Sequence, residues 1–436
     1  MRLKIQIIVV SVYLLSCSKN MEGNGMEEAM IPIKVEIRKE GDAFRLYRGG
    51  APYSFNGAGL NGDIGNLKSH GGNSIRTWDA GNEHQSGLEI LDEAEENGMT
   101  VFMCFYMQPE RHGMDYENEE LVAQQFEKIR RVVLKHKDHP ALLAWCIGNE
   151  MNHSYSNPRV YDAVNEISKW IHEVDPNHPT TTAVASFSPN VVKEVKERAS
   201  DIDFISIQVY GELHVLQDMI RNAGWTKPYM VTEWGAIGHW EMPATEWGAP
   251  IEQTSSQKAA NYLKGYKKSI EPYANQCLGN YVFLWGQKQE RTPTWYGLFL
   301  ESGEETEVID VMHYIWNDKW PANRATSVAY LKLDGKQANE NVYLKPGNLY
   351  EADFAVKDID EDELSFRWVI MRESSAIQEG GDREEIPEKI FEIERTSESA
   401  ISFSAPDSEG AYRLFAYTFD GNGHASHANI PFYVKN

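Results

Sequence analysis

Two apolar stretches that each lead to a glutamate decide the fold: ALLAWCIGNE at residues 141–150 and PYMVTEWG at residues 228–235. A carboxylate at the tip of a buried strand is costly unless another group pairs with it or a reaction uses it. Two such tips, at Glu150 and Glu233, indicate parallel strands of one barrel whose carboxyl ends open into a shared cleft. We therefore expect both side chains to point into one site.

Between residues 53 and 320, short apolar runs alternate with amphipathic stretches, which is the pattern of parallel βα units. Strands are expected at eight places: 54–58, 73–77, 100–106, 142–147, 180–184, 204–208, 229–232 and 278–284. Helical periodicity is clearest at 119–135, 158–174, 212–223 and 255–269. This alternation predicts a (β/α)8 TIM barrel at residues 41–322. A doubly wound open sheet is the competing architecture, but no glycine-rich phosphate loop follows any predicted strand.

The helical periodicity ends near residue 323, and the remaining chain has the alternating pattern of β-strands. Alternating runs are found at 364–370, 400–404, 412–419 and 430–434. The length of this region suits an immunoglobulin-like sandwich. The predicted fold class is therefore α/β, with a TIM barrel followed by a small all-β immunoglobulin-like sandwich at residues 323–436. We expect the second domain to act as a spacer or packing partner.

The first residues have the pattern of a targeting segment. A basic start precedes an apolar run at residues 5–15, which is too short to span a membrane. The sequence LLSC at residues 14–17 resembles a bacterial lipobox, which implies acylation of Cys17. We expect residues 1–17 to be a lipoprotein signal peptide and residues 18–40 a flexible tether; simple secretion is the alternative. The expected location is an outer-membrane lipoprotein with a lipid anchor, at the cell surface or on the periplasmic face.

The composition excludes some partners. The chain has 436 residues and a net charge of −23, which argues against nucleic acid and against an anionic membrane surface. A neutral polysaccharide or oligosaccharide substrate is compatible with this charge, and we expect a monomer. Cys104, Cys146 and Cys277 lie in apolar runs and are predicted to be buried free thiols. We expect no metal and no other cofactor, because no metal-ligand spacing links these cysteines or the loop histidines His153, His239 and His424.

A pair of carboxyl groups in one cleft is typical of glycoside hydrolysis. One carboxyl group must be protonated to donate to the leaving oxygen, while the other must be ionised. Placing the groups within about 5.5 Å pushes their pKa values apart by like-charge repulsion, which supplies both states. The alternative is that Glu150 and Glu233 are salt-bridge residues at the barrel rim. Their positions at two ordered strand tips favour a catalytic pair.

Asn149-Glu150 and Glu233 resemble the catalytic residues of the clan A retaining glycosidases, which place Asn-Glu at the tip of strand four and Glu at the tip of strand seven. The resemblance extends over residues 45–320. It implies that Glu150 is the general acid/base and that Glu233 is the nucleophile. It also implies that Asn149 forms a hydrogen bond with the 2-hydroxyl group of the sugar.

Three more positions match these families. An arginine at the place of Arg76 contacts the nucleophile, and a tyrosine at the place of Tyr210 donates a hydrogen bond to it. Trp285, at the end of the eighth predicted strand, matches the floor beneath the sugar at the cleavage point. An ordinary structural or core role is the alternative for each.

The chain is also rich in aromatic residues, with 12 Trp and 21 Tyr. Sugar rings present C–H faces that stack on aromatic planes. We expect at least three of the following side chains to line the cleft: Trp78, Tyr106, Trp234, Trp240, Trp247, Trp295 and Tyr296. Of these, Trp78, Tyr106 and Trp234 are predicted to bind substrate.

The sequences LYRGGAPY at 46–53 and GGNSIRTW at 71–78, together with a barrel followed by one immunoglobulin-like domain, resemble glycoside hydrolase family 158, whose members are β-1,3-glucanases. The barrel is also similar to that of family 2, whose exo-acting members carry further β-domains before it; we expect those to be missing here. The resemblance implies a retaining endo-β-1,3-glucanase acting on laminarin-type neutral β-glucan. The alternatives are an exo-β-glycosidase or mannanase of the same clan, or a non-catalytic carbohydrate-binding surface lipoprotein.

Overall fold

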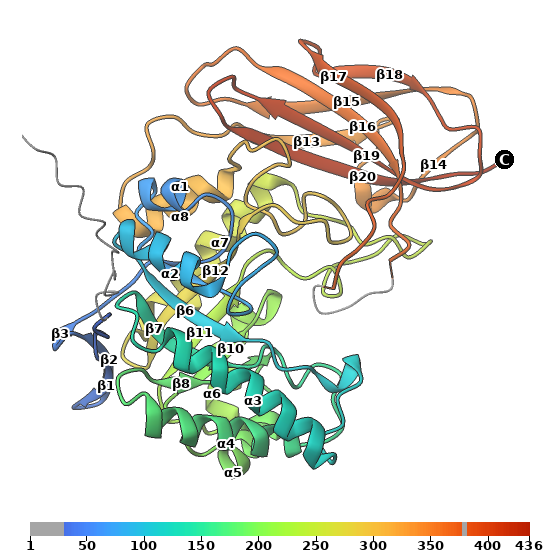
Figure 1. The fold of residues 1–436 in the computed structure, drawn as a ribbon. Helices are drawn as coiled ribbons and strands as arrows, with labels where there is room; N and C mark the ends of the chain where they lie inside the picture. The colour runs from blue at the N-terminus through green and yellow to red at the C-terminus, as the bar shows by residue number, and fades with distance from the viewer. Residues whose placement is uncertain (1–29, 377–381) are drawn as a thin grey trace, which may run out of the picture.

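The computed structural model describes residues 30–376 and 382–436. A parallel β-barrel surrounded by helices forms one part of the molecule, and an all-β sandwich lies against it (Figure 1). The predicted fold class is confirmed. The expected signal peptide, with Cys17, lies outside the described residues. Within them, no helix combines the length and the apolar character needed to cross a bilayer.

The barrel is a parallel sheet with the strand order β8-β7-β6-β5-β4-β12-β11-β10-β9. Its strands are β4 (Gly57–Asn61), β5 (Ser74–Arg76), β6 (Thr100–Phe105), β7 (Leu142–Ile147), β8 (Thr180–Thr181), β9 (Ala183–Ala185), β10 (Ile205–Gln208), β11 (Tyr229–Trp234) and β12 (Cys277–Gly286). The fifth predicted strand is divided at Thr182, so that β8 pairs with β7 and β9 pairs with β10. This one broken strand therefore brings the two ends of the sheet together.

The prediction of the first barrel strand at residues 54–58 is wrong by three residues, because β4 begins at Gly57. Glycines weaken a strand signal, and β4 contains two of them. Gly59 is needed because the ring of Trp78 lies against it: an added Cβ would lie 2.8 Å from that ring. The glycine that lets Trp78 pack at the barrel mouth therefore also makes β4 difficult to recognise in the sequence.

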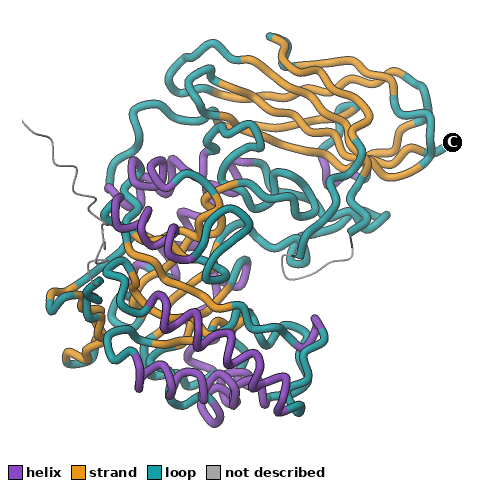
Figure 2. The backbone as a smooth tube through the Cα atoms, in the orientation of Figure 1, coloured by secondary structure: helices purple, strands orange, loops and turns teal. Residues whose placement is uncertain are grey.

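The helices cover the outside of the barrel (Figure 2). They are α1 (Ile64–Ser69), α2 (Gly87–Glu96), α3 (Glu119–His136), α4 (Arg159–Val174), α5 (Pro189–Arg198), α6 (Leu216–Asn222), α7 (Ser255–Ser269) and α8 (Glu307–Asn317). Local signals set several of their starts. For example, Thr254 and Gln257 form a capping box at the start of α7.

Strand residues alternate between the barrel interior and the helices. On β6, Phe102 and Cys104 pack inside the barrel, whereas Val101, Met103 and Phe105 pack toward the helices. The three cysteines predicted to be free and buried are so: Cys104, Cys146 and Cys277. Burial on both faces explains why the barrel strands are almost continuously apolar in sequence.

A three-stranded antiparallel sheet packs against the barrel interior at the N-terminal ends of the barrel strands. It is formed by β1 (Val35–Glu40), β2 (Ala43–Arg48) and β3 (Ala51–Pro52). Val35 and Leu46 join the interior cluster that contains Phe102 and Tyr281. The expectation of a flexible tether to residue 40 is therefore wrong for residues 35–40. Their apolar side chains alternate with charged ones, which is a strand pattern with one buried face.

The sandwich has two sheets, with the strand orders β13-β15-β18 and β14-β20-β19-β16-β17. Its strands are β13 (Ser327–Leu333), β14 (Val342–Leu344), β15 (Leu349–Lys357), β16 (Ser365–Arg372), β17 (Lys389–Thr396), β18 (Ala400–Ser404), β19 (Gly410–Phe419) and β20 (Ala425–Val434). Buried polar contacts join it to the barrel. Glu252, which follows β11, accepts hydrogen bonds from Lys258 on α7 (2.5 Å) and from Asn429 on β20 (2.6 Å).

Candidate active site

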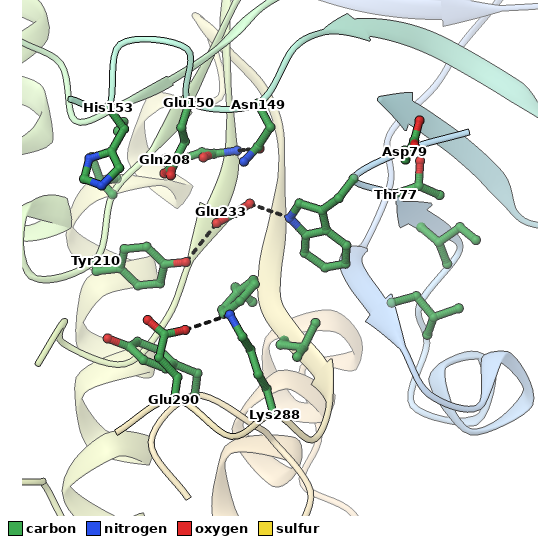
Figure 3. A pocket seen from close by; sticks show the side chains of 18 of the residues that line it. Thr77, Asp79, Asn149, Glu150, His153, Gln208, Tyr210, Glu233, Lys288 and Glu290 are labelled. Carbon is green, nitrogen blue, oxygen red and sulfur yellow. Dashed lines mark hydrogen bonds and ion pairs between the residues drawn. The ribbon is translucent and has the colours of Figure 1, made fainter. Parts of the chain in front are cut away.

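A cavity of about 1340 Å³ opens at the carboxyl ends of the barrel strands. Both glutamates singled out in the sequence line it, together with Trp78, Asn149 and Tyr210. Glu150 follows β7, whereas Glu233 lies within β11. Figure 3 shows Asn149 and Glu150 on one side of Glu233, and Lys288 and Glu290 on the other. The barrel thus brings the two carboxyl groups to one cavity.

Three donors hold the Glu233 carboxylate. Arg76 Nη1 lies 2.5 Å from Oε1, and Trp78 Nε1 donates to the same oxygen at 2.8 Å. The hydroxyl of Tyr210 donates to Oε2 at 2.8 Å (Figure 3). Burial, and then the charge of Glu233, raises the pKa of Tyr210 well above its usual value, so this hydroxyl keeps its proton. One cation and two neutral donors therefore stabilise the ionised carboxylate and fix its orientation.

Arg76 lies beneath the cavity, with no exposed surface. Its second nitrogen, Nη2, donates to Asn149 Oδ1 at 2.6 Å, and Gln208 Nε2 donates to the same oxygen at 2.7 Å. Both acceptor positions of Asn149 Oδ1 are thus occupied. The amide NH2 group is what Asn149 offers to a ligand.

Glu150 is in a different electrostatic environment. Burial first, and then the negative charge of Glu233, raises its pKa to about 8; the charge of Arg76 opposes this shift. Its backbone has a left-handed conformation (φ +49°), and its N–H donates to the carbonyl oxygen of Ala183 at 3.0 Å. A carboxyl group with this pKa is protonated at neutral pH. The cavity therefore holds a proton donor near a carboxylate that three donors stabilise.

Besides Arg76, which was also predicted to bind substrate and lies beneath the cavity, three residues predicted to bind substrate do not line it. Trp234 is fully buried and donates to Asn280 Oδ1 at 2.9 Å. The reason is strand alternation: Glu233 faces inward, so its neighbour faces the helices. Trp285 is also buried and stacks on Trp316 of α8. A register shift between Val282 and Trp285 in the pairing of β12 with β4 changes the side on which the last residues of β12 lie.

The third residue, Tyr106, is 53% exposed, and its hydroxyl lies 3.4 Å from His112 Nδ1, away from the cavity. The expectation that at least three of the seven aromatic residues line the cleft is nevertheless confirmed, by Trp78, Trp240 and Tyr296. Phe283 lines the cavity where Trp285 was expected, and its ring meets that of Trp78 edge to face at 5.8 Å.

The sequence reasoning missed several cavity residues. Gln208 ends the buried run of β10, so the strand-tip argument that found Glu150 could have found it too. Lys288 and Glu290 form an ion pair at 2.7 Å across the cavity from Glu150 (Figure 3), and no pattern in the sequence indicated it. His153 and His239 line the cavity as well. Among the described residues, no group of three or more histidine, cysteine or acidic side chains is arranged to hold a metal ion.

The sandwich holds one wall of the cavity. Arg291 belongs to the loop between β12 and α8, lines the cavity and has a left-handed backbone (φ +59°). Its N–H donates to Glu384 Oε2 at 2.7 Å, and its guanidinium donates to the carbonyl oxygen of Ala376. Both acceptors lie between β16 and β17 of the sandwich. The second domain therefore does more than space the barrel from its surroundings.

Replacing Glu384 with alanine is expected to loosen this wall. The N–H of Arg291 would lose its buried acceptor, which costs about 1–3 kcal/mol of folding free energy. We expect a lower melting temperature and a KM for oligosaccharides raised several-fold. Thermal unfolding and steady-state kinetics measure these changes. Glu385→Ala is the matched control, because Glu385 is exposed; equal effects of the two substitutions would contradict the role of Glu384.

The chain is similar to several known carbohydrate-active enzymes. A mannan endo-1,4-beta-mannosidase F of Aspergillus clavatus is 35% identical over 120 residues, which cover 23% of this chain and 28% of that protein. An FMN-binding beta-glucuronidase from Facaelibacterium prausnitzii L2-6 is similar in structure, with a TM-score of 0.50 and 13% identity, over 92% of this chain and 59% of that one. An endo-1,4-beta-mannanase from Eisenia fetida has a TM-score of 0.39 and 14% identity, over 59% of this chain and 92% of that one.

The chain therefore spans little more than a quarter of the curated mannosidase and about three fifths of the glucuronidase structure. The glucuronidase likeness, at this identity, concerns the fold alone. The family match is stronger, because residues 54–278, more than half of the chain, match the family described as glycosyl hydrolases family 2, TIM barrel domain. This chain, with a carboxyl pair at the mouth of that barrel, therefore belongs to glycosyl hydrolase family 2.

Proposed function

We propose that the protein is a retaining endo-β-1,3-glucanase that hydrolyses neutral, laminarin-type β-glucan through Glu233 and Glu150. The observation that carries the mechanism is the contrast between the two carboxyl groups. Glu233 is held by Arg76, Trp78 and Tyr210, whereas the raised pKa of Glu150, about 8, keeps its proton in place at neutral pH. A nucleophile must be an ionised carboxylate, and a general acid must be a protonated carboxyl group.

The reaction has two steps. Glu233 attacks the anomeric carbon while the bond to the glycosidic oxygen breaks, and Glu150 gives its proton to that oxygen. The leaving sugar departs as an alcohol, and the remaining sugar is an ester of Glu233. A water molecule then attacks the same carbon, its proton returns to Glu150, and Glu233 is released. Two inversions give net retention.

The charges around the cavity support a neutral substrate. Two cationic side chains, Lys288 and Arg291, belong to the described lining, and both have partners: Glu290 and the carbonyl oxygen of Ala376. Besides the protonated Glu150, the lining contains these acidic residues: Asp79, Glu93, Glu212, Glu233, Glu241 and Glu290. A sugar carboxylate would be repelled here. We therefore propose a neutral glucan rather than a uronic acid.

The preference for endo action rests on size. The cavity volume, about 1340 Å³, exceeds the roughly 300–1,000 Å³ of an ordinary small-molecule site, so there is room for several sugar units. The β-1,3 linkage rests on the likeness of residues 46–53 and 71–78 to glycoside hydrolase family 158. A β-1,4-mannanase is the second candidate, which the 35% identity to the Aspergillus mannosidase favours.

Product analysis on four polymers tests the proposal. Laminarin, mixed-linkage glucan, mannan and cellulose are each digested, and the products are separated by size. We expect a ladder of laminari-oligosaccharides, with the β-anomer formed first in proton NMR. Hydrolysis of mannan alone would replace the proposed function with the second candidate, and an α-anomer formed first would overturn the retaining mechanism.

We also propose that the protein is a monomeric outer-membrane lipoprotein anchored through Cys17. The support is the lipobox-like sequence LLSC at residues 14–17. Cys17→Ala is expected to move the protein from the membrane fraction to the soluble fraction, because it removes the attachment point of the acyl chains, which supply about 0.8 kcal/mol of membrane affinity per buried CH2 group. Fractionation and radiolabelled palmitate incorporation measure this. Label incorporated equally by Cys17→Ala and the unchanged protein would contradict the anchor.

A further inference from the structure

Trp240 differs from the other tryptophans around the cavity. Trp234, Trp285 and Trp295 are buried, and Trp78 is half-buried with its Nε1 committed to Glu233. Trp240 also lines the cavity, yet 61% of its surface is exposed. Ligand cavities are lined largely by apolar and aromatic side chains, so an indole ring that is open to solvent at the cavity is available to a ligand.

The neighbours of Trp240 hold its ring in place. The rings of His239 and Tyr210 meet it edge to face, at 4.9 and 5.9 Å. Gly238 lies against the indole, where an added Cβ would come within 2.5 Å of the ring. The indole is therefore exposed but restricted in its orientation, so a ligand that stacks on it loses little extra conformational entropy.

The next residue, Glu241, fixes the backbone at this point. Its Oε2 accepts hydrogen bonds from the N–H groups of Gly211 (2.8 Å) and Gly238 (2.9 Å), and its Oε1 accepts one from Glu212 (3.1 Å). These bonds tie the loop after β11, which carries Trp240, to the segment after β10, which carries Tyr210. A carboxylate that accepts three backbone N–H groups is a strong local constraint.

We propose that Trp240 is a stacking platform for a sugar ring adjacent to the one at the cleavage point, and that Glu241 is the positioning residue that orients it. Tyr210 links the two places, because its ring touches Trp240 while its hydroxyl donates to Glu233. The ligand is a neutral pyranose unit of an oligosaccharide, which presents a C–H face to the indole. The inference rests on the proposed hydrolysis of a β-linked polysaccharide, but not on the linkage.

Chain-length kinetics test the platform. The variants are Trp240→Ala, Trp240→Phe, Glu241→Gln and the control Trp247→Ala. Trp247 follows the same strand, but its ring packs on Tyr343 and Tyr433 of the sandwich. The substrates are β-1,3-glucose and β-1,4-mannose oligosaccharides of two to six units, and the matching glycosyl fluorides, which fill one subsite.

Trp240→Ala is expected to lower kcat/KM on long oligosaccharides about tenfold, mainly through KM. The loss should be much smaller on the glycosyl fluoride. Trp240→Phe should recover most of the loss, because it restores an aromatic plane. Glu241→Gln should show the same dependence on chain length, which a general loss of stability would not. Trp247→Ala should behave like the unchanged enzyme on every substrate.

Calorimetric titration in a Glu233→Gln background separates the platform from the linkage. If Trp240→Ala weakens binding of mannose but not glucose oligosaccharides, the role of Trp240 as a stacking platform is supported and the β-1,3-glucanase assignment is wrong. If an oligosaccharide binds and Trp240→Ala matches Trp247→Ala, the platform is overturned while the proposed function remains. Failure of every oligosaccharide to bind would overturn both.

Discussion

Glu233→Gln is expected to lower kcat on the polymeric substrate by about 10⁴-fold or more, because an amide is a poor nucleophile toward the anomeric carbon. The substitution keeps the size of the side chain. It also leaves the charge of Arg76 without its carboxylate, so some loss of stability should accompany the loss of activity. Steady-state rates and thermal unfolding measure both effects. A variant that keeps more than a few per cent of the rate would exclude Glu233 as the nucleophile.

A rescue experiment assigns the role more sharply. In Glu233→Ala, added azide can occupy the vacated space and attack the anomeric carbon once, so the product should be the α-glycosyl azide from an activated β-glycoside. Glu290→Gln is the control, since it removes another carboxylate of the same cavity, one paired with Lys288. It should cost far less activity and show no rescue by azide. A β-configured azide from Glu233→Ala would indicate that the two glutamates have exchanged roles.

The positions of the two glutamates were predictable because they follow from strand order. Residues 142–147 form β7 at the predicted bounds, and the buried run before Glu233 forms β11. Parallel strands of a barrel open toward one end, so polar side chains at their tips must meet. The same rule applied to Gln208 would have added it to the site.

The errors come from side-chain direction rather than from the strands themselves. Trp234 could have been excluded, because it follows an inward-facing residue on a strand and must face outward. Trp285 could not, since the register shift in the last part of β12 arises from pairing with β4, which lies more than two hundred residues earlier. The hydrophobic pattern of the residues around Trp285 gives no information on the register between two strands so far apart in the sequence.

Most of the strands missed in the sandwich lie at sheet edges. Four of its strands were predicted. Of the four that were missed, β14 and β17 lie at the edges of one sheet and β13 at the edge of the other, whereas β15 is the central strand of its sheet. Edge strands bury less surface and carry more charge, which weakens the alternation that identifies a strand. The loop wall of the cavity is harder still to predict, because Arg291 is held by Glu384 and Ala376 from another domain.

Glu150→Gln should reduce kcat/KM on glucan by about 10²–10⁴-fold, the usual contribution of a general acid. The loss should be small on aryl glycosides with good leaving groups, since departure of these groups needs no proton. Azide should then rescue Glu150→Ala at the second step and give the β-glycosyl azide, opposite in configuration to the product from Glu233→Ala. An equal loss on both kinds of substrate would contradict the role of Glu150 as the acid.

The pH profile gives an independent test of the same residue. Because burial and Glu233 raise the pKa of Glu150 to about 8, the carboxyl group is protonated below that pH and ionised above it. The first step needs the protonated form, so kcat/KM on glucan should fall as the pH rises through about 8. In Glu150→Gln nothing titrates at this position, so the alkaline limb should disappear from the residual activity of the variant on glucan. Persistence of that limb in the variant would assign it to another group.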